Sequence, residues 1–155
     1  VAVGDWRMRT MHSLAYALTQ FDTKLIYITP DEYVPDDGLI KEVQGRGLDI
    51  ERAEHINQVI GQADIVFIEP VVQPDYTKGR QDRTAEVART PANYVVDTDV
   101  LAHAKPSSIV IHSLPRMDEL PPTVDATRHA RYWQEAYYGV VMRMALLALV
   151  LGAAE

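Results

Sequence analysis

The sequence lacks cysteine altogether, and it is short of positive charge. The missing cysteine excludes a disulfide framework and a thiolate active site. The 15 Lys and Arg residues stand against 22 Asp and Glu residues, so the net charge is −7 at pH 7. Binding to nucleic acid or to an anionic membrane requires a basic surface. We therefore expect neither nucleic acid nor membrane as a partner.

Motifs of several common enzyme classes are also missing. The chain has no Gly-x-Gly-x-x-Gly dinucleotide loop, no Gly-x-Ser-x-Gly nucleophile elbow and no His-Glu-x-x-His metal motif. We expect no cofactor and no metal ion. The long apolar stretch at residues 136–154 approaches the ~20 residues of a membrane span. Gly139 and Arg143 interrupt it, so it is predicted to be a buried C-terminal helix.

Short apolar runs alternate with segments of helical periodicity along the chain. The predicted strands are residues 1–3, 24–28, 64–68, 94–96 and 108–111, and the predicted helices are residues 10–21, 38–44, 56–62, 100–104 and 131–151, the last either continuous or broken at Gly139. This alternation predicts an α/β fold, a three-layer sandwich with a mainly parallel sheet flanked by helices. A strand at the extreme N-terminus suggests a piece of a longer protein. The polar stretch 73–91 is predicted to be a long, functional or mobile loop.

Three loops leave the carboxyl ends of predicted strands, where open parallel sheets bind ligands. They are residues 4–10, 69–73 and 112–119, and they offer Arg7, Arg9, Thr10, Gln73, His112 and Arg116. Clustered guanidinium groups in an acidic chain favour an anionic small molecule, and the start of a helix near Arg9 adds a positive dipole end. The alternative is that each Arg is a surface charge or a salt-bridge partner, and that His112 is a structural hydrogen-bonding residue.

Three segments resemble the aspartate/ornithine carbamoyltransferase family. Val-Gly-Asp at residues 3–5, followed by Arg-Thr-Met-His-Ser-Leu at 9–14, resembles the family's Val-Gly-Asp and Gly-Arg-Thr-Val-His-Ser-Leu motifs. Residues 112–119, His-Ser-Leu-Pro-Arg-Met-Asp-Glu, resemble its His-Pro-Leu-Pro-Arg-Val-Asp-Glu loop. Residues 144–151, Met-Ala-Leu-Leu-Ala-Leu-Val-Leu, resemble its final helix. The order and spacing of the segments agree over nearly the whole chain.

The resemblance implies a Rossmann-like carbamoyltransferase domain over residues 1–155. This would be the amino-acid-binding (Asp/Orn) domain, with the N-terminal carbamoyl-phosphate domain absent from this chain. The family transfers a carbamoyl group from carbamoyl phosphate to the amine of aspartate in pyrimidine biosynthesis, without a metal or a covalent intermediate. The resemblance further implies carbamoyl phosphate and an amino acid as partners, a homo-oligomer (a trimer) and a cytoplasmic location.

The resemblance also assigns roles within the predicted site. Arg9 matches the Arg that holds the amino acid's carboxylate, and Leu114 matches the residue whose backbone carbonyl contacts the carbamoyl amino group. The implied substrate-binding residues are Arg9, Thr10, Gln73, His112, Leu114 and Arg116. No catalytic residue is expected in this chain. It also lacks the family's phosphate-binding loop, so it is predicted to be inactive alone.

Among the departures from the family pattern, one bears directly on the substrate. Gln73 can be matched to the Gln of the family's Arg-x-Gln motif, but the motif's Arg has no counterpart, because Glu69 or Pro70 stands there. An acid at this position would repel a dicarboxylate. Two alternatives therefore stay open. One is a non-catalytic carbamoyltransferase-like binding or regulatory subunit, and the other is a transcarbamoylase for a different amine, in which Glu69 pairs with a cationic substrate.

Overall fold

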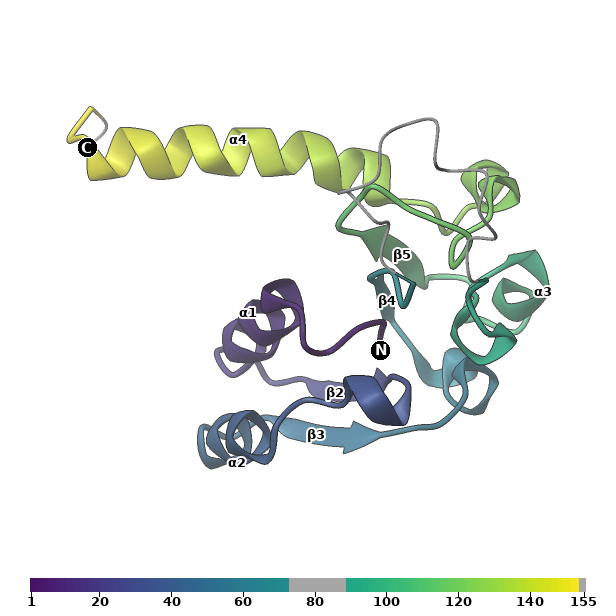
Figure 1. Cartoon of the computed structure of the whole chain (residues 1–155). Coiled ribbons are helices and arrows are strands. Elements are labelled where there is room, and N and C mark those ends of the chain that lie inside the picture. Colours follow the sequence, from purple (N-terminus) through teal and green to yellow (C-terminus); the bar gives the residue numbers. More distant parts are fainter. Residues whose placement is uncertain (73–88, 154–155) are drawn as a thin grey trace, which may run out of the picture.

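The computed structural model describes residues 1–72 and 89–153. Its strands form one parallel sheet in the order β3-β2-β1-β4-β5 (Figure 1). They are β1 (Ala2–Val3), β2 (Lys24–Ile28), β3 (Asp49–Arg52), β4 (Ile65–Ile68) and β5 (Ile109–His112). The strand order reverses between β1 and β4, and ligands of open α/β sheets bind at such a reversal. The predicted α/β fold with a parallel sheet flanked by helices is confirmed.

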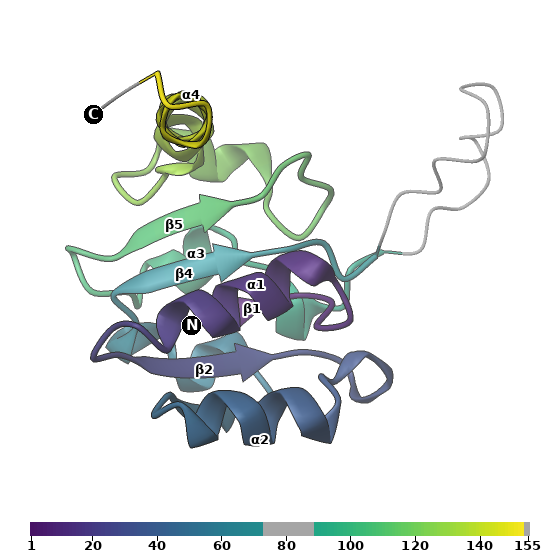
Figure 2. The same cartoon turned by 90° about the vertical axis from the view of Figure 1, so that its left-hand side faces the viewer.

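Each face of the sheet has its own core. Helices α1 (Arg9–Leu18) and α2 (Asp37–Gly45) cover one face, around buried Trp6 and Met11 (Figure 2). Helix α3 (Thr98–Leu101) belongs to the other face, where its side chains join a cluster with Val66. Successive side chains of a strand point to opposite faces, which explains why the central strands are apolar on both sides.

Two parts of the chain differ from the predicted strands. Residues 94–96 do not form a strand, so that prediction was wrong. Pro91 begins a 3₁₀ turn, η5 (Ala92–Tyr94), and the Val96 N–H then donates to the Glu119 carbonyl at 2.9 Å instead of joining the sheet. Strand β3 was not predicted, because it lies at the sheet edge and buries only Ile50 among charged neighbours.

The predicted helix at residues 56–62 is two 3₁₀ turns, η2 (Ile56–Gln58) and η3 (Ile60–Gln62). Other helix starts agree with the sequence. Asp36 caps α2 by accepting the Leu39 N–H at 3.0 Å, and Asp97 caps α3 by accepting the Val100 N–H at 2.9 Å. Such caps satisfy backbone donors that have no partner inside the helix.

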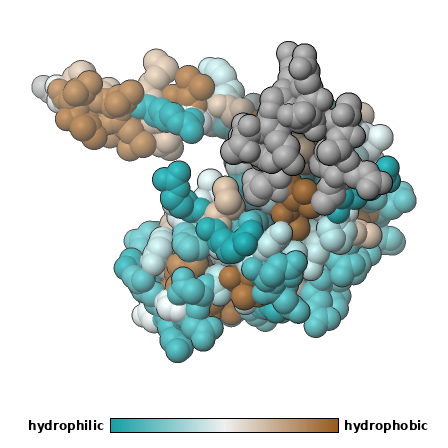
Figure 3. Space-filling model, viewed as in Figure 1, coloured by the Kyte–Doolittle hydropathy of each residue, from teal (hydrophilic) through white to brown (hydrophobic). Residues whose placement is uncertain are grey.

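Helix α4 (Tyr132–Val150) is continuous through Gly139. Its first residue is fully buried, but the helix then projects away from the sheet (Figure 1). Figure 3 shows hydrophobic residues covering most of the projecting part. Its large exposed side chains from the middle onward are Val140, Val141, Met142, Met144, Leu146, Leu147, Leu149 and Val150. The prediction of a buried helix is therefore correct only for its beginning. In the described part of the chain, no helix combines the length and apolarity that a membrane crossing needs.

Candidate functional site

The carboxyl ends of β1 and β4 approach each other closely at the reversal of the sheet. Gly4, directly after β1, has a φ of +145°, and a Cβ there would lie 2.5 Å from the Glu69 carbonyl oxygen. No side chain fits at this distance, and the φ angle itself favours glycine. Gly4 thus lets the backbone of the first loop pass against Glu69 at the edge where ligands are expected.

A groove of about 940 Å³ opens beside this edge. Its lining residues include Arg9 and Thr10 from α1, Phe67 from β4, His112 at the end of β5, Leu114 from the loop after β5, and Glu135 and Arg143 from α4. Four of the six predicted substrate-binding residues therefore meet in one place. Gln73 lies outside the described residues, as does most of the predicted loop at 73–91.

Arg116, the sixth predicted residue, is engaged elsewhere. Its guanidinium forms a two-pronged pair with the Asp125 carboxylate, with Nη2 2.8 Å from Oδ2, and it donates to the Tyr132 hydroxyl at 3.3 Å. Hydrogen bonds from Arg116 and Tyr132 lower the pKa of Asp125 to about 2. This cluster fastens the loop after β5 to the first turn of α4. A binding role for Arg116 stays a prediction, and the pairing matches the salt-bridge alternative.

Arg7 is also used inside the protein. Its Nε and Nη2 donate to the two oxygens of Asp5 at 2.9 and 2.7 Å, and its guanidinium lies 3.9 Å from the centre of the Tyr33 ring. Asp5 is buried, so the pair compensates a carboxylate that has left water. Arg7 therefore braces the loop after β1 and does not line the groove.

Arg9 differs from both. It is exposed and forms no ion pair with the residues that the structure describes. It is the first residue of α1, whose N-cap residue, Met8, makes no side-chain capping bond. Uncapped backbone N–H groups and the positive end of the helix dipole favour an anion at this place. Arg9 adds a guanidinium fork, which suits a carboxylate.

His112 organises the opposite wall. Its Nδ1 accepts the Leu114 N–H at 2.8 Å, so the ring proton resides on Nε2, which donates to Glu119 Oε1 at 2.8 Å. Both side chains are fully buried. Glu119 Oε1 also accepts the Met117 N–H at 2.7 Å. His112 is thus neutral and holds Leu114, whose φ is +54°, against the groove. This geometry matches the structural alternative for His112, and a substrate contact stays a prediction.

Glu135 is a groove residue that the sequence reasoning missed. Its Oε2 accepts the backbone N–H of His112 at 2.8 Å, which links the first turn of α4 to the end of β5. Burial is the main cause that raises the pKa of Glu135, and the charge of nearby Glu69 raises it further. Glu69 is buried, and its Oε1 has no hydrogen-bond partner among the described residues. The sequence feature that could have identified Glu135 is that it is the only acid in the first turn of a mostly apolar helix.

The groove is therefore lined by two cations, Arg9 on α1 and Arg143 on α4, and by the carboxylate of Glu135 on α4. The buried carboxylate of Glu69 lies near Glu135. Within residues 1–72 and 89–153, no group of three or more His, Asp or Glu residues could hold a metal ion. The arrangement suits a small molecule that bears both an anionic and a cationic group, because each group finds a complementary side chain.

Comparison with known proteins gives a consistent result. Residues 1–150 match the family model for the aspartate/ornithine carbamoyltransferase Asp/Orn-binding domain. The aspartate carbamoyltransferase catalytic subunits of Methanocella arvoryzae and Archaeoglobus fulgidus are 38% and 36% identical, over 97% and 96% of this chain and 47% of each relative. The aspartate transcarbamoylase of Trypanosoma cruzi, solved with carbamoyl phosphate and aspartate, superposes with a TM-score of 0.73 at 29% identity, covering 94% of this chain and 46% of that one. The chain spans about half the length of the curated relatives it matches.

Proposed function

The chain belongs to the aspartate/ornithine carbamoyltransferase family, and from this premise we propose that it is the amino-acid-binding domain of an aspartate carbamoyltransferase. In this proposal, the other half of the protein binds carbamoyl phosphate, and the joined halves carbamoylate the amine of aspartate. The observation that carries the proposal is Arg9, which stands at the uncapped start of α1 in the groove without an ion-pair partner among the described residues.

The proposed chemistry needs positioning more than it needs a reactive side chain. The amine of the amino acid attacks the carbamoyl carbon, and phosphate leaves. Fixing both reactants in one geometry removes much of the entropic barrier to such a reaction. Arg9 would hold a carboxylate, and Leu114, held by His112, would form the wall beside the reacting amine. The two named ligands of the Trypanosoma cruzi complex, carbamoyl phosphate and aspartate, support this assignment.

The exposed half of α4 fits a domain that needs a second half. We propose that it docks on the carbamoyl-phosphate domain, and that this chain alone turns over no substrate, since it has no phosphate-binding loop of its own. By resemblance to the family, the joined protein forms a homo-oligomer, a trimer, in the cytoplasm. An assay of the isolated chain with carbamoyl phosphate and aspartate tests the first point, and turnover above the enzyme-free blank would contradict it.

Replacing the unpaired arginine tests the assignment of the groove. A charge-assisted two-pronged pair contributes roughly 1.5–3 kcal/mol, so Arg9→Ala should weaken aspartate binding about 10- to 150-fold. The measurement is a calorimetric titration of the joined protein with aspartate, with inorganic phosphate present so that no turnover occurs. Arg46→Ala, which removes an exposed arginine from the end of α2, is the matched control.

Two outcomes would contradict the proposal. Equal aspartate affinities in the wild type and Arg9→Ala would place the carboxylate elsewhere. Stronger wild-type binding of ornithine than of aspartate would favour the reading in which Glu69 attracts a cationic substrate.

A further inference from the structure

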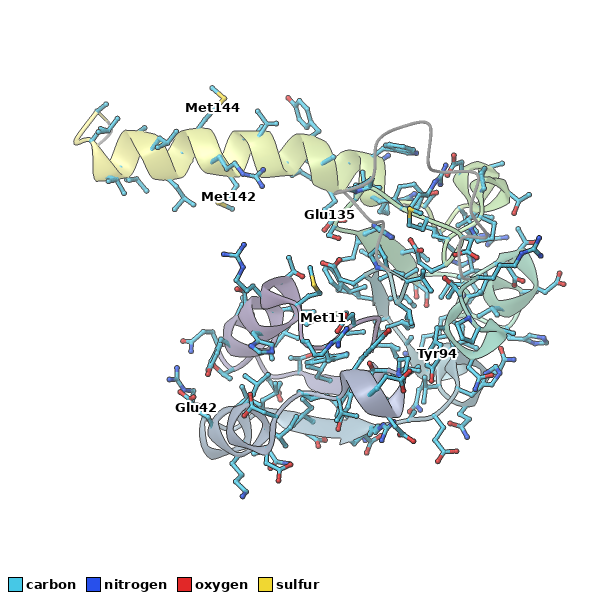
Figure 4. The ribbon with its side chains drawn as sticks, in the orientation of Figure 1. Met11, Glu42, Tyr94, Glu135, Met142 and Met144 are labelled. Atoms are coloured by element: carbon cyan, nitrogen blue, oxygen red, sulfur yellow. The ribbon has the colours of Figure 1, made fainter. Side chains whose placement is uncertain are left out.

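The groove carries opposite charges on facing elements. Arg9 lines it from α1, and Glu135 lines it from the first turns of α4. Figure 4 shows the Glu135 side chain pointing from α4 toward the strand ends. One carboxylate oxygen of Glu135, Oε2, is occupied by the His112 N–H, whereas Oε1 makes no hydrogen bond with a described residue. The carboxylate is therefore held in place with one oxygen available to a ligand.

A second carboxylate stands behind the first. Glu69 is only 4% exposed, and its Oε1 lacks a hydrogen-bond partner among the described residues. A buried polar atom without a partner is costly, and a ligand that donates hydrogen bonds or brings positive charge relieves that cost. Neither Glu69 nor Glu135 forms an ion pair with a described cation. The two carboxylates therefore make the groove negative beside the ends of β4 and β5. Its cations are Arg9 on α1 and Arg143, about two turns further along α4 than Glu135.

We propose that Glu135, backed by Glu69, is the ammonium subsite of this groove, where the amine of the substrate binds as its cation while Arg9 holds a carboxylate of the same molecule. This inference rests on the proposed function and adds the group that recognises the amine. It explains how a groove lined by Glu135, with Glu69 buried nearby, serves an acidic amino acid: the ammonium group compensates the acids. A plain dicarboxylate would meet repulsion at the same place.

A purely structural role for Glu135 makes a different prediction. In that case its only task is to tie α4 to β5 through the His112 N–H. Glu135→Gln separates the two roles, because the amide oxygen still accepts that N–H while the negative charge is lost. The variant is nearly isosteric, so it keeps the volume and the acceptor on which local packing depends.

The test compares aspartate with succinate, which has both carboxylates but no amine. Calorimetric titrations use the joined protein with inorganic phosphate present. The wild type should prefer aspartate at least about 10-fold, the size of one charge-assisted hydrogen bond. Glu135→Gln should weaken aspartate binding about 10- to 100-fold and leave succinate binding unchanged or stronger, so that the preference collapses. Glu42→Gln, on α2 and outside the groove, removes the same charge as a control.

The outcomes separate the inference from the proposed function. If Glu135→Gln keeps the wild-type preference for aspartate, or weakens both ligands equally, the ammonium subsite is overturned while the proposed function stands. A wild type that binds aspartate no better than succinate also overturns the subsite, and this measurement needs no variant. A wild type that binds neither ligand overturns the proposed function and the inference together.

Discussion

The two halves of α4 have the same helical geometry and different surroundings. The near half is residues 132–139, and the far half is residues 140–150. In the near half, Tyr132 is fully buried, its hydroxyl donates to Asp125, and Glu135 accepts a hydrogen bond from β5. In the far half, Leu147 is 61% exposed and Val150 is 82% exposed. Within α4 only Tyr132 belongs to the core of this domain, because Trp133, Tyr137 and Tyr138 of the near half are already 52%, 66% and 65% exposed. The far half has the apolar composition of a buried helix, but its large apolar side chains are exposed in the described part of the chain.

Apart from Arg143, the far half is apolar on every side, which distinguishes it from an ordinary surface helix. A surface helix has one apolar stripe and one polar face, whereas a helix that is hydrophobic all round is normally buried. Contiguous apolar patches of this kind mark interaction sites in soluble proteins. The contrast within α4 supports the proposals that its first turn stabilises this chain and that the far half docks on a second domain or on another copy.

Stability measurements on matched variants should show the largest difference between the halves. Tyr132→Ala should lower the free energy of unfolding by about 3–5 kcal/mol, the usual cost of removing a buried aromatic side chain. Leu147→Ala should change it by less than about 0.5 kcal/mol, since that side chain lies in solvent. Urea unfolding of the isolated chain, at a concentration low enough to keep it monomeric, provides both values. Similar losses in the two variants would show that the far half packs against the domain after all.

The sequence was sufficient for β1, β2, β4 and β5, because each is an apolar run: β1 and β2 bury successive residues, and β4 and β5 bury every second residue. It was insufficient at the edge strand β3. Strand β3 buries only Ile50, so no apolar run signals it. Conversely, the apolar run that suggested a strand at residues 94–96 follows Pro91, and its backbone bonds with the Glu119 segment. The hydrophobic pattern of a sequence detects burial. It therefore misses a strand such as β3, which is hydrogen-bonded but mostly exposed, and it wrongly predicts a strand at residues 94–96, which are apolar but do not pair with the sheet.

The candidate site was predictable in position and less so in detail. The rule that ligands bind at the carboxyl ends of parallel strands placed Arg9 and Leu114 at the right edge. The partners of the other residues could not be read from spacing, because Arg116 pairs with a residue nine positions away and Glu135 bonds to one 23 positions away. Such pairings decide which charge is free for a ligand, and they exist only once the chain is folded.

Self-association should test the far half directly. In the isolated chain we expect its apolar side chains to pair with those of another copy as concentration rises. Leu147→Glu should weaken that association about 10- to 100-fold, because burying one leucine contributes about 1.5–3 kcal/mol and the glutamate resists burial. Sedimentation across a concentration series measures the effect, and Gln44→Glu on α2 controls for the added charge. A wild-type monomer at every concentration would remove the basis for this interpretation.

The smallest expected effect concerns stability at acid pH. It distinguishes the first turn of α4, which an ion pair anchors, from the far half, which is mostly apolar. Arg116 and Tyr132 lower the pKa of Asp125 to about 2 in the folded chain, whereas an unfolded Asp titrates near about 3.9. Between these values the unfolded chain binds more protons, so stability falls as the pH falls. The contribution of Asp125 is complete above pH ~4 and is lost as the pH drops through about 2.

Asp125→Asn should therefore flatten the stability profile between about pH 4 and about pH 2 relative to the wild type. The Asp125 side chain is 35% exposed, so solvent screening limits the difference to under about 1 kcal/mol. Leu147→Ala should keep the wild-type profile, because the far half has no ion pair among the described residues that acid could disrupt. Unfolding by urea at a series of pH values gives all three curves. If Asp125→Asn and the wild type lose stability in parallel over this range, the Arg116–Asp125–Tyr132 cluster does not anchor the near half of α4, and packing of Tyr132 alone holds it.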